Sequence, residues 1–110
     1  MLSIGYNIYM RITKKNDCYI IKDDKDLVGA VKEIVATDER PILFVYITKD
    51  IKDPNYIADI VDHIIRYFKK KGFDYVYFNC SVKHNQLLEN YIYGLGSKID
   101  NHLYRTIIRA

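Results

Sequence analysis

The stretch DPNYIADIVDHIIRYFKKKG, Asp53–Gly72, predicts one long amphipathic helix around which the rest of the chain is arranged. Asp53 can cap the first amide groups, and Pro54 suits the first helical position because it has no N–H to leave unpaired. Lysines in the last turn suit the negative end of the helix dipole, and Gly72 suits a left-handed stop. The apolar residues recur at intervals of three and four and form one buried stripe at positions 57, 60, 61, 64, 65 and 68.

Apolar runs on both sides of this helix predict two strands. Ile42–Ile47 precedes the helix and Tyr75–Cys80 follows it. A strand, a helix and a strand in that order form a crossover unit, which implies parallel or at least neighbouring strands. Ile42–Ile47 is apolar at every position, so we expect a central strand that is covered on both faces.

The N-terminal part of the chain predicts a series of strands joined by polar turns. The third strand contains Gly29, which suggests a bulge or the close approach of another backbone. A short helix is the competing interpretation of that segment, but the polar tip before it and its β-branched residues favour a strand. The expected segments are a strand at 3–13, a turn at Lys14–Asp17, a strand at Cys18–Ile21, a tip at Lys22–Asp26 and a strand at Leu27–Val35.

The C-terminal part predicts a second helix and a final strand. The helix runs from Ser81 or His84 to Leu95, a connection follows at Lys98–His102, and the last strand is Leu103–Ile108. The expected order is therefore β-β-β-β-α-β-α-β. We expect an α+β fold with a mixed, mostly antiparallel sheet and two main helices.

Length and composition limit the class of protein. A chain of 110 residues with 49% hydrophobic residues forms one domain, residues 1–110, with its own core. The 17 basic and 14 acidic residues are too balanced to indicate a nucleic-acid partner. No stretch reaches the roughly 20 apolar residues that span a bilayer, and the first residues lack the pattern of a signal peptide. We therefore expect a cytoplasmic protein with no nucleic-acid or membrane partner.

The sequence offers little support for a metal or redox site. Cys18 and Cys80 lie in expected strands and are interpreted as buried thiols, because neither has a Cys or His at metal-ligand spacing. The acidic residues around the start of the long helix are expected there because of the helix dipole. His63 lies off the apolar stripe and is interpreted as a surface or boundary residue. We expect no metal.

Two segments resemble the GCN5-related N-acetyltransferase (GNAT) family. Residues 69–107, KKKGFDYVYFNCSVKHNQLLENYIYGLGSKIDNHLYRTI, are similar to the family's last third, in which a helix ends in Gly, a strand follows and an Asn opens the next helix. Asp24–Gly29 resembles the hairpin in which a Gly follows the turn. The resemblance runs from Cys18 to the end of the chain. It implies the GNAT fold, acetyl-CoA as the cofactor and N-acetyl transfer as the reaction.

The phosphate loop departs from the family pattern. GNAT proteins bind the cofactor's pyrophosphate on a loop of the form Gln/Arg-x-x-Gly-x-Gly/Ala just before the long helix, where amide groups and small residues meet the phosphates. The matching window here places Ile51 at the Gln/Arg position and Pro54 and Tyr56 at the glycine positions. Pro54 removes a donor and Tyr56 adds bulk. Asp50, Asp53 and Asp59 bring negative charge to the same end.

Two further departures concern the general acid and the acceptor site. The family's acid is a Tyr four residues before a helix-ending Gly, a position that Ile92 holds when Gly96 is that Gly; Tyr91 and Tyr93 flank it, each turned about 100° round the helix. Asn85 does match the family's Asn. Between Ile12 and Cys18 there is room only for a turn, so the acceptor-side helices of the family are missing.

Two functions follow from this comparison. The departures favour a GNAT-like protein-binding module, an inhibitor, adaptor or assembly subunit, that works with a protein partner or as a homo-oligomer and has no bound cofactor. The alternative is a compact acetyl-CoA-dependent N-acetyltransferase whose cofactor lies between strands 42–47 and 75–80. For that enzyme the resemblance implies catalytic roles for Glu33, Asn85, Tyr91 and Tyr93, and acetyl-CoA binding by Tyr46, Ile47, Thr48, Lys52, Asn55 and Asn85.

Overall fold

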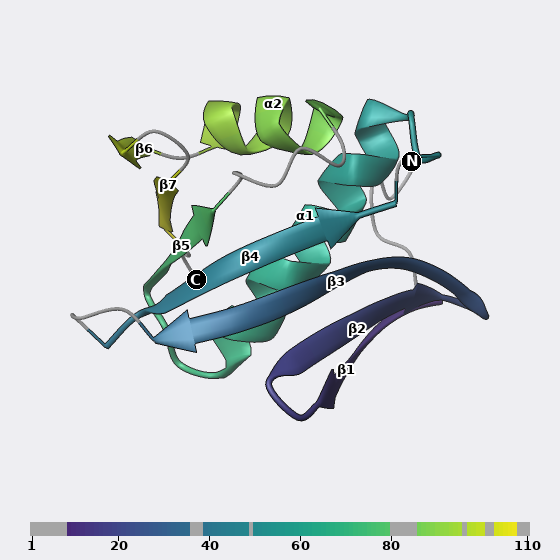
Figure 1. Cartoon of the computed structure of the whole chain (residues 1–110), viewed down its shortest axis with the longest axis horizontal. Helices are drawn as coiled ribbons and strands as arrows, with labels where there is room; N and C mark the ends of the chain where they lie inside the picture. Colours follow the sequence, from purple (N-terminus) through teal and green to yellow (C-terminus); the bar gives the residue numbers. More distant parts are fainter. Residues whose placement is uncertain are drawn as a thin grey trace.

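A computed structural model describes residues 9–35, 39–48, 50–79, 86–95, 97–100 and 103–107, which form one mixed sheet and two helices (Figure 1). The expected α+β class is confirmed. The strands are β1 Met10–Lys15, β2 Cys18–Asp23, β3 Asp26–Val35, β4 Pro41–Ile47, β5 Tyr75–Asn79, β6 Ser97–Asp100 and β7 Leu103–Ile107. The helices are α1 Pro54–Lys70, between β4 and β5, and α2 Gln86–Leu95, between β5 and β6.

The seven strands lie in the order β1-β2-β3-β4-β5-β7-β6. Every neighbouring pair is antiparallel except β4 and β5, which run parallel and are joined through α1. The expected crossover unit is therefore confirmed. The predicted order lacked one strand, because Ser97–Asp100, which overlaps the expected connection Lys98–His102, pairs with β7.

Both N-terminal hairpin turns are tighter than the sequence suggested. The predicted turn at Lys14–Asp17 is wrong at Lys14 and Lys15, since β1 continues through Lys15. The predicted tip at Lys22–Asp26 likewise shrinks, because β2 extends to Asp23 and β3 begins at Asp26. Asn16 and Asp24 adopt φ angles of 60° and 57°. Asn and Asp tolerate this left-handed conformation, which permits two-residue turns. The part of the expected first strand at 3–8 lies outside the described residues.

Gly29 combines the two features that its position suggested. The register of β2 against β3 shifts between Ile21 and Lys22, because Ile21 pairs with Gly29 and Lys22 with Leu27. Val28 is therefore the extra residue of a bulge. A Cβ atom on Gly29 would also collide with the backbone oxygen of Tyr46 on β4. The segment is a strand, so the competing helix interpretation is excluded.

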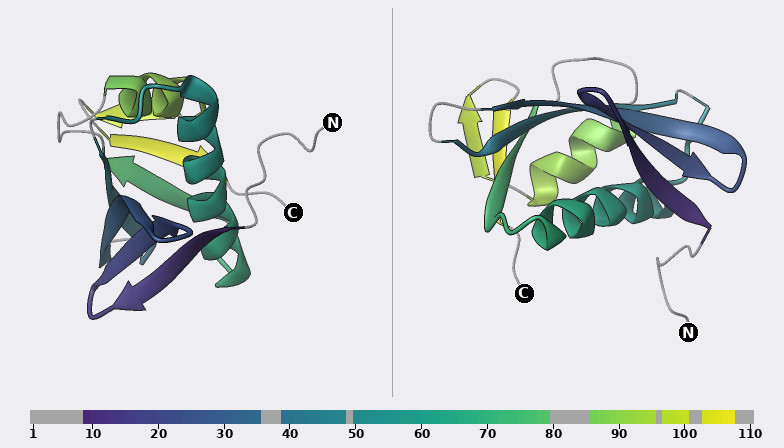
Figure 2. Two further views of the ribbon diagram at one scale, coloured as in Figure 1. Left: turned by 90° about the vertical axis from the view of Figure 1, so that its right-hand side faces the viewer. Right: turned by 90° about the horizontal axis from the view of Figure 1, so that it is seen from below.

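Both helices cover the same face of the sheet (Figure 2). On β4 this face carries Leu43, Val45 and Ile47, which are all buried, whereas the alternate residues Ile42, Phe44 and Tyr46 are half-buried. β4 is a central strand, as expected, but the expectation that it is covered on both faces is wrong for the described part of the chain, where no helix lies over the second face. A strand can be apolar at every position and still have one face only partly covered.

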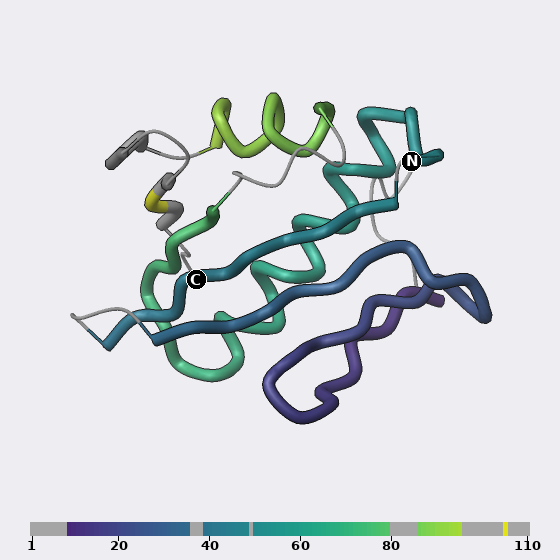
Figure 3. The backbone as a smooth tube through the Cα atoms, in the orientation of Figure 1, coloured from purple at the N-terminus to yellow at the C-terminus, as the bar shows by residue number. Residues whose placement is uncertain are grey.

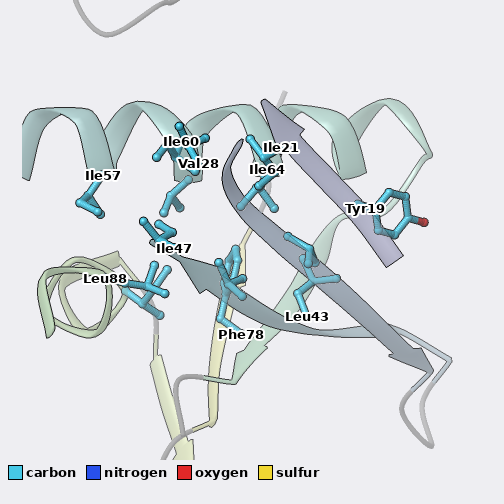
Figure 4. Close-up of a cluster of buried hydrophobic side chains, with 14 of the residues drawn as sticks. Tyr19, Ile21, Val28, Leu43, Ile47, Ile57, Ile60, Ile64, Phe78 and Leu88 are labelled. Carbon is cyan, nitrogen blue, oxygen red and sulfur yellow. The ribbon is translucent and has the colours of Figure 1, made fainter. Parts of the chain in front are cut away.

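The core lies between this sheet face and α1, whose apolar stripe the sequence predicted (Figure 4). Ile57, Ile60, Val61, Ile64 and Phe68 of α1 are buried against Ile21, Val31, Leu43, Val45, Ile47, Val76 and Phe78 of the sheet. Each such side chain contributes roughly 1.5–3 kcal/mol when it is fully buried. This packing sets the course of α1, which runs diagonally behind β4 and β3 (Figure 3).

Local signals begin and end α1 as expected. The carboxylate of Asp53 accepts a hydrogen bond from the amide of Asn55, and Pro54 is the first helical residue. After Lys70 the chain turns at Gly72, whose φ is 97° and whose amide donates to the oxygen of Lys69 at 2.9 Å. In α2, Leu88 and Ile92 are buried, while the expected start at Ser81 or His84 lies outside the described residues.

Candidate functional site

The N-terminus of α1 is where the GNAT resemblance places the cofactor phosphates. The carboxylate of Asp53 accepts from Asn55 N at 2.9 Å. The backbone oxygen of Asp53 accepts from Tyr56 N at 3.0 Å and from Ile57 N at 3.1 Å. Pro54 has no N–H. The first turn of α1 therefore has no amide donor left over for an anion, which is the group that a helix N-terminus normally offers a phosphate.

Tyr56 closes the same end of the helix. Its hydroxyl donates to the carboxylate of Asp23 at the end of β2. Burial raises the pKa of Tyr56 above its ordinary value, and the hydrogen bond to Asp23 and the negative charges of Asp59 and Asp26 raise it further. Asp23, Asp26 and Asp59 therefore bring negative charge to the Tyr56 hydroxyl, and Asp53 brings a further carboxylate to the first turn of α1. The local field therefore opposes an anion.

The end of β4 is held by β3. The amide of Thr48 donates to the oxygen of Val28 at 3.1 Å, and the amide of Ile51 donates to the oxygen of Thr48 at 3.3 Å. Ile47 is fully buried, and Tyr46 and Thr48 are half-buried. The candidate cofactor residues Tyr46, Ile47 and Thr48 lie at the end of β4, just before the segment that leads into α1. The Thr48 amide is already hydrogen-bonded to β3.

Two of the remaining candidate cofactor residues lie at the start of α1. Lys52 and Asn55 are exposed beside the first turn of α1, and Lys52 is the one cation among the six candidates. Asn85 lies outside the described residues. The parallel pairing of β4 with β5 covers Ile42–Phe44 against Tyr77–Asn79. A continuation would involve Cys80 onward, which also lies outside them, so the expected cofactor gap between these strands stays a prediction.

The two candidate acids on α2 lie in different environments. Tyr91 is half-buried, and burial together with the charge of Asp62 on α1 raises its pKa. Tyr93 is 65% exposed, and Ile92 between them is fully buried. The position that the family uses for its acid therefore faces the core. A protonated Tyr91 could donate a proton. Its side chain, however, leaves the helix about 100° away from position 92, which the family uses for its acid.

Glu33, another candidate catalytic residue, belongs to another part of the molecule. It pairs with Leu43 near the start of β4, whereas Tyr46–Thr48 lie at the end of that strand. Its carboxylate accepts the hydroxyl of the buried Tyr19 at 2.5 Å, and the Lys71 ammonium donates to the same hydroxyl at 3.0 Å. Burial and then the hydrogen bond to Glu33 raise the pKa of Tyr19. The structure does not bring Glu33 together with the α1 N-terminus.

Sequence reasoning missed the two tyrosine–carboxylate contacts. Tyr56 and Asp23 are 33 residues apart, and Tyr19 and Glu33 are 14 residues apart. No local pattern marks such pairs. The weak signal that could have suggested them is the large number of tyrosines, since a buried tyrosine hydroxyl usually has a hydrogen-bond partner.

The other candidate groups form no cluster in the described residues. Among these residues no group of three or more His, Cys, Asp or Glu side chains is placed to hold a metal ion. Cys18 is a half-buried thiol rather than a buried one, and Cys80 lies outside them. His63 is half-buried, which agrees with its interpretation as a boundary residue. Its Nδ1 atom lies 2.9 Å from the backbone oxygen of Asp59.

Neither helix of the described chain is long and apolar enough to cross a membrane. No family model matches the chain, and no curated protein is found to be similar to it.

Proposed function

We propose that this chain is a GNAT-like domain that does not carry out acetyl-CoA chemistry and acts by binding another protein, as an inhibitor, an adaptor or an assembly subunit. The observation that carries this proposal is the first turn of α1. Its amide groups are all used by Asp53, Pro54 supplies none, and the carboxylates of Asp23, Asp53 and Asp59 lie around it. A pyrophosphate would meet negative charge where an acetyltransferase needs donors.

The test is a titration with CoA and with acetyl-CoA, followed by calorimetry and by thermal unfolding. An active acetyltransferase with its cofactor at about 100 times the dissociation constant would gain about 2.7 kcal/mol, which raises the melting temperature of a domain of this size by about 10 °C. We expect no binding heat and no such shift at millimolar cofactor. Saturable binding would overturn the proposal in favour of a compact N-acetyltransferase.

The binding half of the proposal has its own measurement. A protein-binding module forms a complex of fixed stoichiometry, which light scattering coupled to size exclusion detects for a homo-oligomer. Affinity capture from the native cell extract, with quantification of the captured chains, detects another protein. A chain that is strictly monomeric and recovers no stoichiometric partner would contradict this half.

A further inference from the structure

A groove of about 730 Å³ lies between β1 and α1, on the opposite side of the helix from β4 and β5. Met10 and Ile12 of β1 and Ile65 of α1 give it an apolar floor. Arg66, Lys69 and Lys70 of α1 line it with positive charge. None of these residues belongs to the start of α1, so the groove is separate from the site described above.

The strand that borders the groove is the edge of the sheet. Within the described part of the chain, β1 pairs with β2 alone. The amide of Asp24 donates to the oxygen of Tyr9, which fixes the alternation of the ladder. The backbone groups of Arg11, Thr13 and Lys15 then face β2, and those of Met10, Ile12 and Lys14 face the open edge. Met10 and Ile12 thus offer both hydrogen-bonding groups and an apolar side chain to the groove.

The charge around the groove is one-sided. Lys14 and Lys71 lie at its end, where their ammonium groups stack on the Tyr19 ring at 5.8 and 5.2 Å from its centre. With Lys69 and Lys70 they place four lysines at the end of α1 and along β1. The single carboxylate in the lining is Asp62, and Arg66 already binds it at 2.8 Å. A segment that enters this groove therefore meets positive charge that needs a negative partner.

We propose that the β1–α1 groove binds an extended, acidic segment of another protein, which adds to β1 as an antiparallel strand. This inference rests on the proposed function and names the class of partner. Charge decides against a second copy of the chain, because two β1 strands side by side would oppose Arg11, Lys14 and Lys15 to each other. In the added strand, apolar residues pack on Met10, Ile12 and Ile65, and acidic residues face the lysines.

The first test uses a fluorescein-labelled peptide of sequence Glu-Glu-Val-Glu-Val-Glu-Glu and measures fluorescence anisotropy. We expect saturable binding that weakens at least about fivefold between about 50 and about 500 mM salt. In the antiparallel register the valine amides donate to β1 and the amide of the central glutamate points away. N-methylation of both valines should abolish binding, while N-methylation of the central glutamate should leave it nearly unchanged. Equal binding of both methylated peptides would overturn strand addition.

The second test reverses charge on the protein. Lys69→Glu combined with Lys70→Glu should weaken peptide binding by about tenfold or more, because two attractive contacts become repulsive. The matched control is Lys25→Glu combined with Lys32→Glu, two exposed lysines outside the groove lining, which makes the same change in net charge and should change binding less than about twofold. Circular dichroism verifies that the variants are folded. A similar loss in both variants would mean attraction by net charge alone and would overturn the proposal.

Two outcomes separate this inference from the proposed function. No peptide binding in a chain that also fails to bind CoA would reject the groove and leave the binding-module proposal standing. Saturable CoA binding would reject the binding module, and the peptide titration would still decide the groove. A homodimer that dissociates in the Lys69→Glu/Lys70→Glu variant would make a second copy the occupant and would overturn the acidic partner.

Discussion

Gly29 lies where β3 leaves no room for a side chain beside the backbone of β4. A Cβ atom there would collide with the oxygen of Tyr46, which is part of a strand and has little room to move. Gly29→Ala should therefore lower the free energy of unfolding by about 1–3 kcal/mol, the usual effect of an overpacked site. Urea unfolding followed by circular dichroism measures this change.

The control is another glycine. Gly94 lies in α2 with nothing within 4 Å of the position of a Cβ atom. Gly94→Ala should be neutral or stabilising by up to about 1 kcal/mol, because Ala loses less backbone entropy in a helix. Equal destabilisation by the two substitutions would show that close backbone contact is not what selects Gly29.

Helix α1 depends on its cap as well as on its buried stripe. Asp53→Ala removes the carboxylate that accepts from Asn55 N, so we expect the free energy of unfolding to fall by about 1 kcal/mol. Asp50→Ala removes an exposed carboxylate three residues earlier and should change stability by less than about 0.5 kcal/mol. Urea unfolding compares the two variants. A loss as large for Asp50 would indicate a general charge effect rather than a cap.

The elements that sequence predicted best are those whose signals are local. The cap at Asp53, the apolar stripe and the stop at Gly72 lie within one stretch, and α1 follows them, except that Ile65 is only half-buried and Asp59 is buried. The strand at Ser97–Asp100 was missed because four mostly polar residues show no clear alternation, and only its pairing with β7 makes it a strand. The hairpin turns were predicted to be longer than they are. Asn16 and Asp24 adopt left-handed conformations that make tight turns possible, and Asn and Asp permit this conformation but do not require it.

In the candidate site, too, the features set by neighbouring residues were predictable and those set by distant contacts were not. The blocked first turn of α1 was predictable, because Asp53, Pro54 and Tyr56 act on their immediate neighbours. The hydrogen bond from Tyr56 to Asp23 and the placement of Glu33 beside Tyr19 were not, since each depends on how distant strands and the helix pack together. The basic groove could not be predicted from the sequence for a similar reason, because its lysines lie in two separate segments, on β1 and at the end of α1.

At the scale of the whole molecule, hydrogen bonds of two tyrosine hydroxyls connect both ends of α1 to the N-terminal strands. At the first turn, Tyr56 donates to Asp23. Beyond the last turn, Lys71 donates to the Tyr19 hydroxyl, which donates in turn to Glu33. The helix is thereby fixed in position along β2 and β3 in addition to its apolar contacts. Both hydroxyls are protonated in this arrangement, so its stability depends on pH at the alkaline end.

In both tyrosines the folded-state pKa is raised above the ordinary value near 10. On going above that pH the unfolded chain releases these protons first, so it binds fewer protons than the folded chain and the free energy of unfolding falls as pH rises. The variant Tyr19→Phe/Tyr56→Phe lacks both groups. It should be less stable at neutral pH, because it loses three hydrogen bonds, but its stability should fall less steeply between about pH 9 and about pH 11.

Urea unfolding across this range measures the two slopes, and Tyr93→Phe, a change at a tyrosine that is 65% exposed, is the control that should keep the slope of the unmodified chain. The slopes are compared rather than the absolute stabilities, since loss of a hydrogen bond shifts the whole curve and loss of a titrating group changes its gradient. Parallel curves for the unmodified chain and the double variant would mean that Tyr19 and Tyr56 keep their ordinary acidity in the folded state. In that case the two hydroxyls would not hold α1 in place as described.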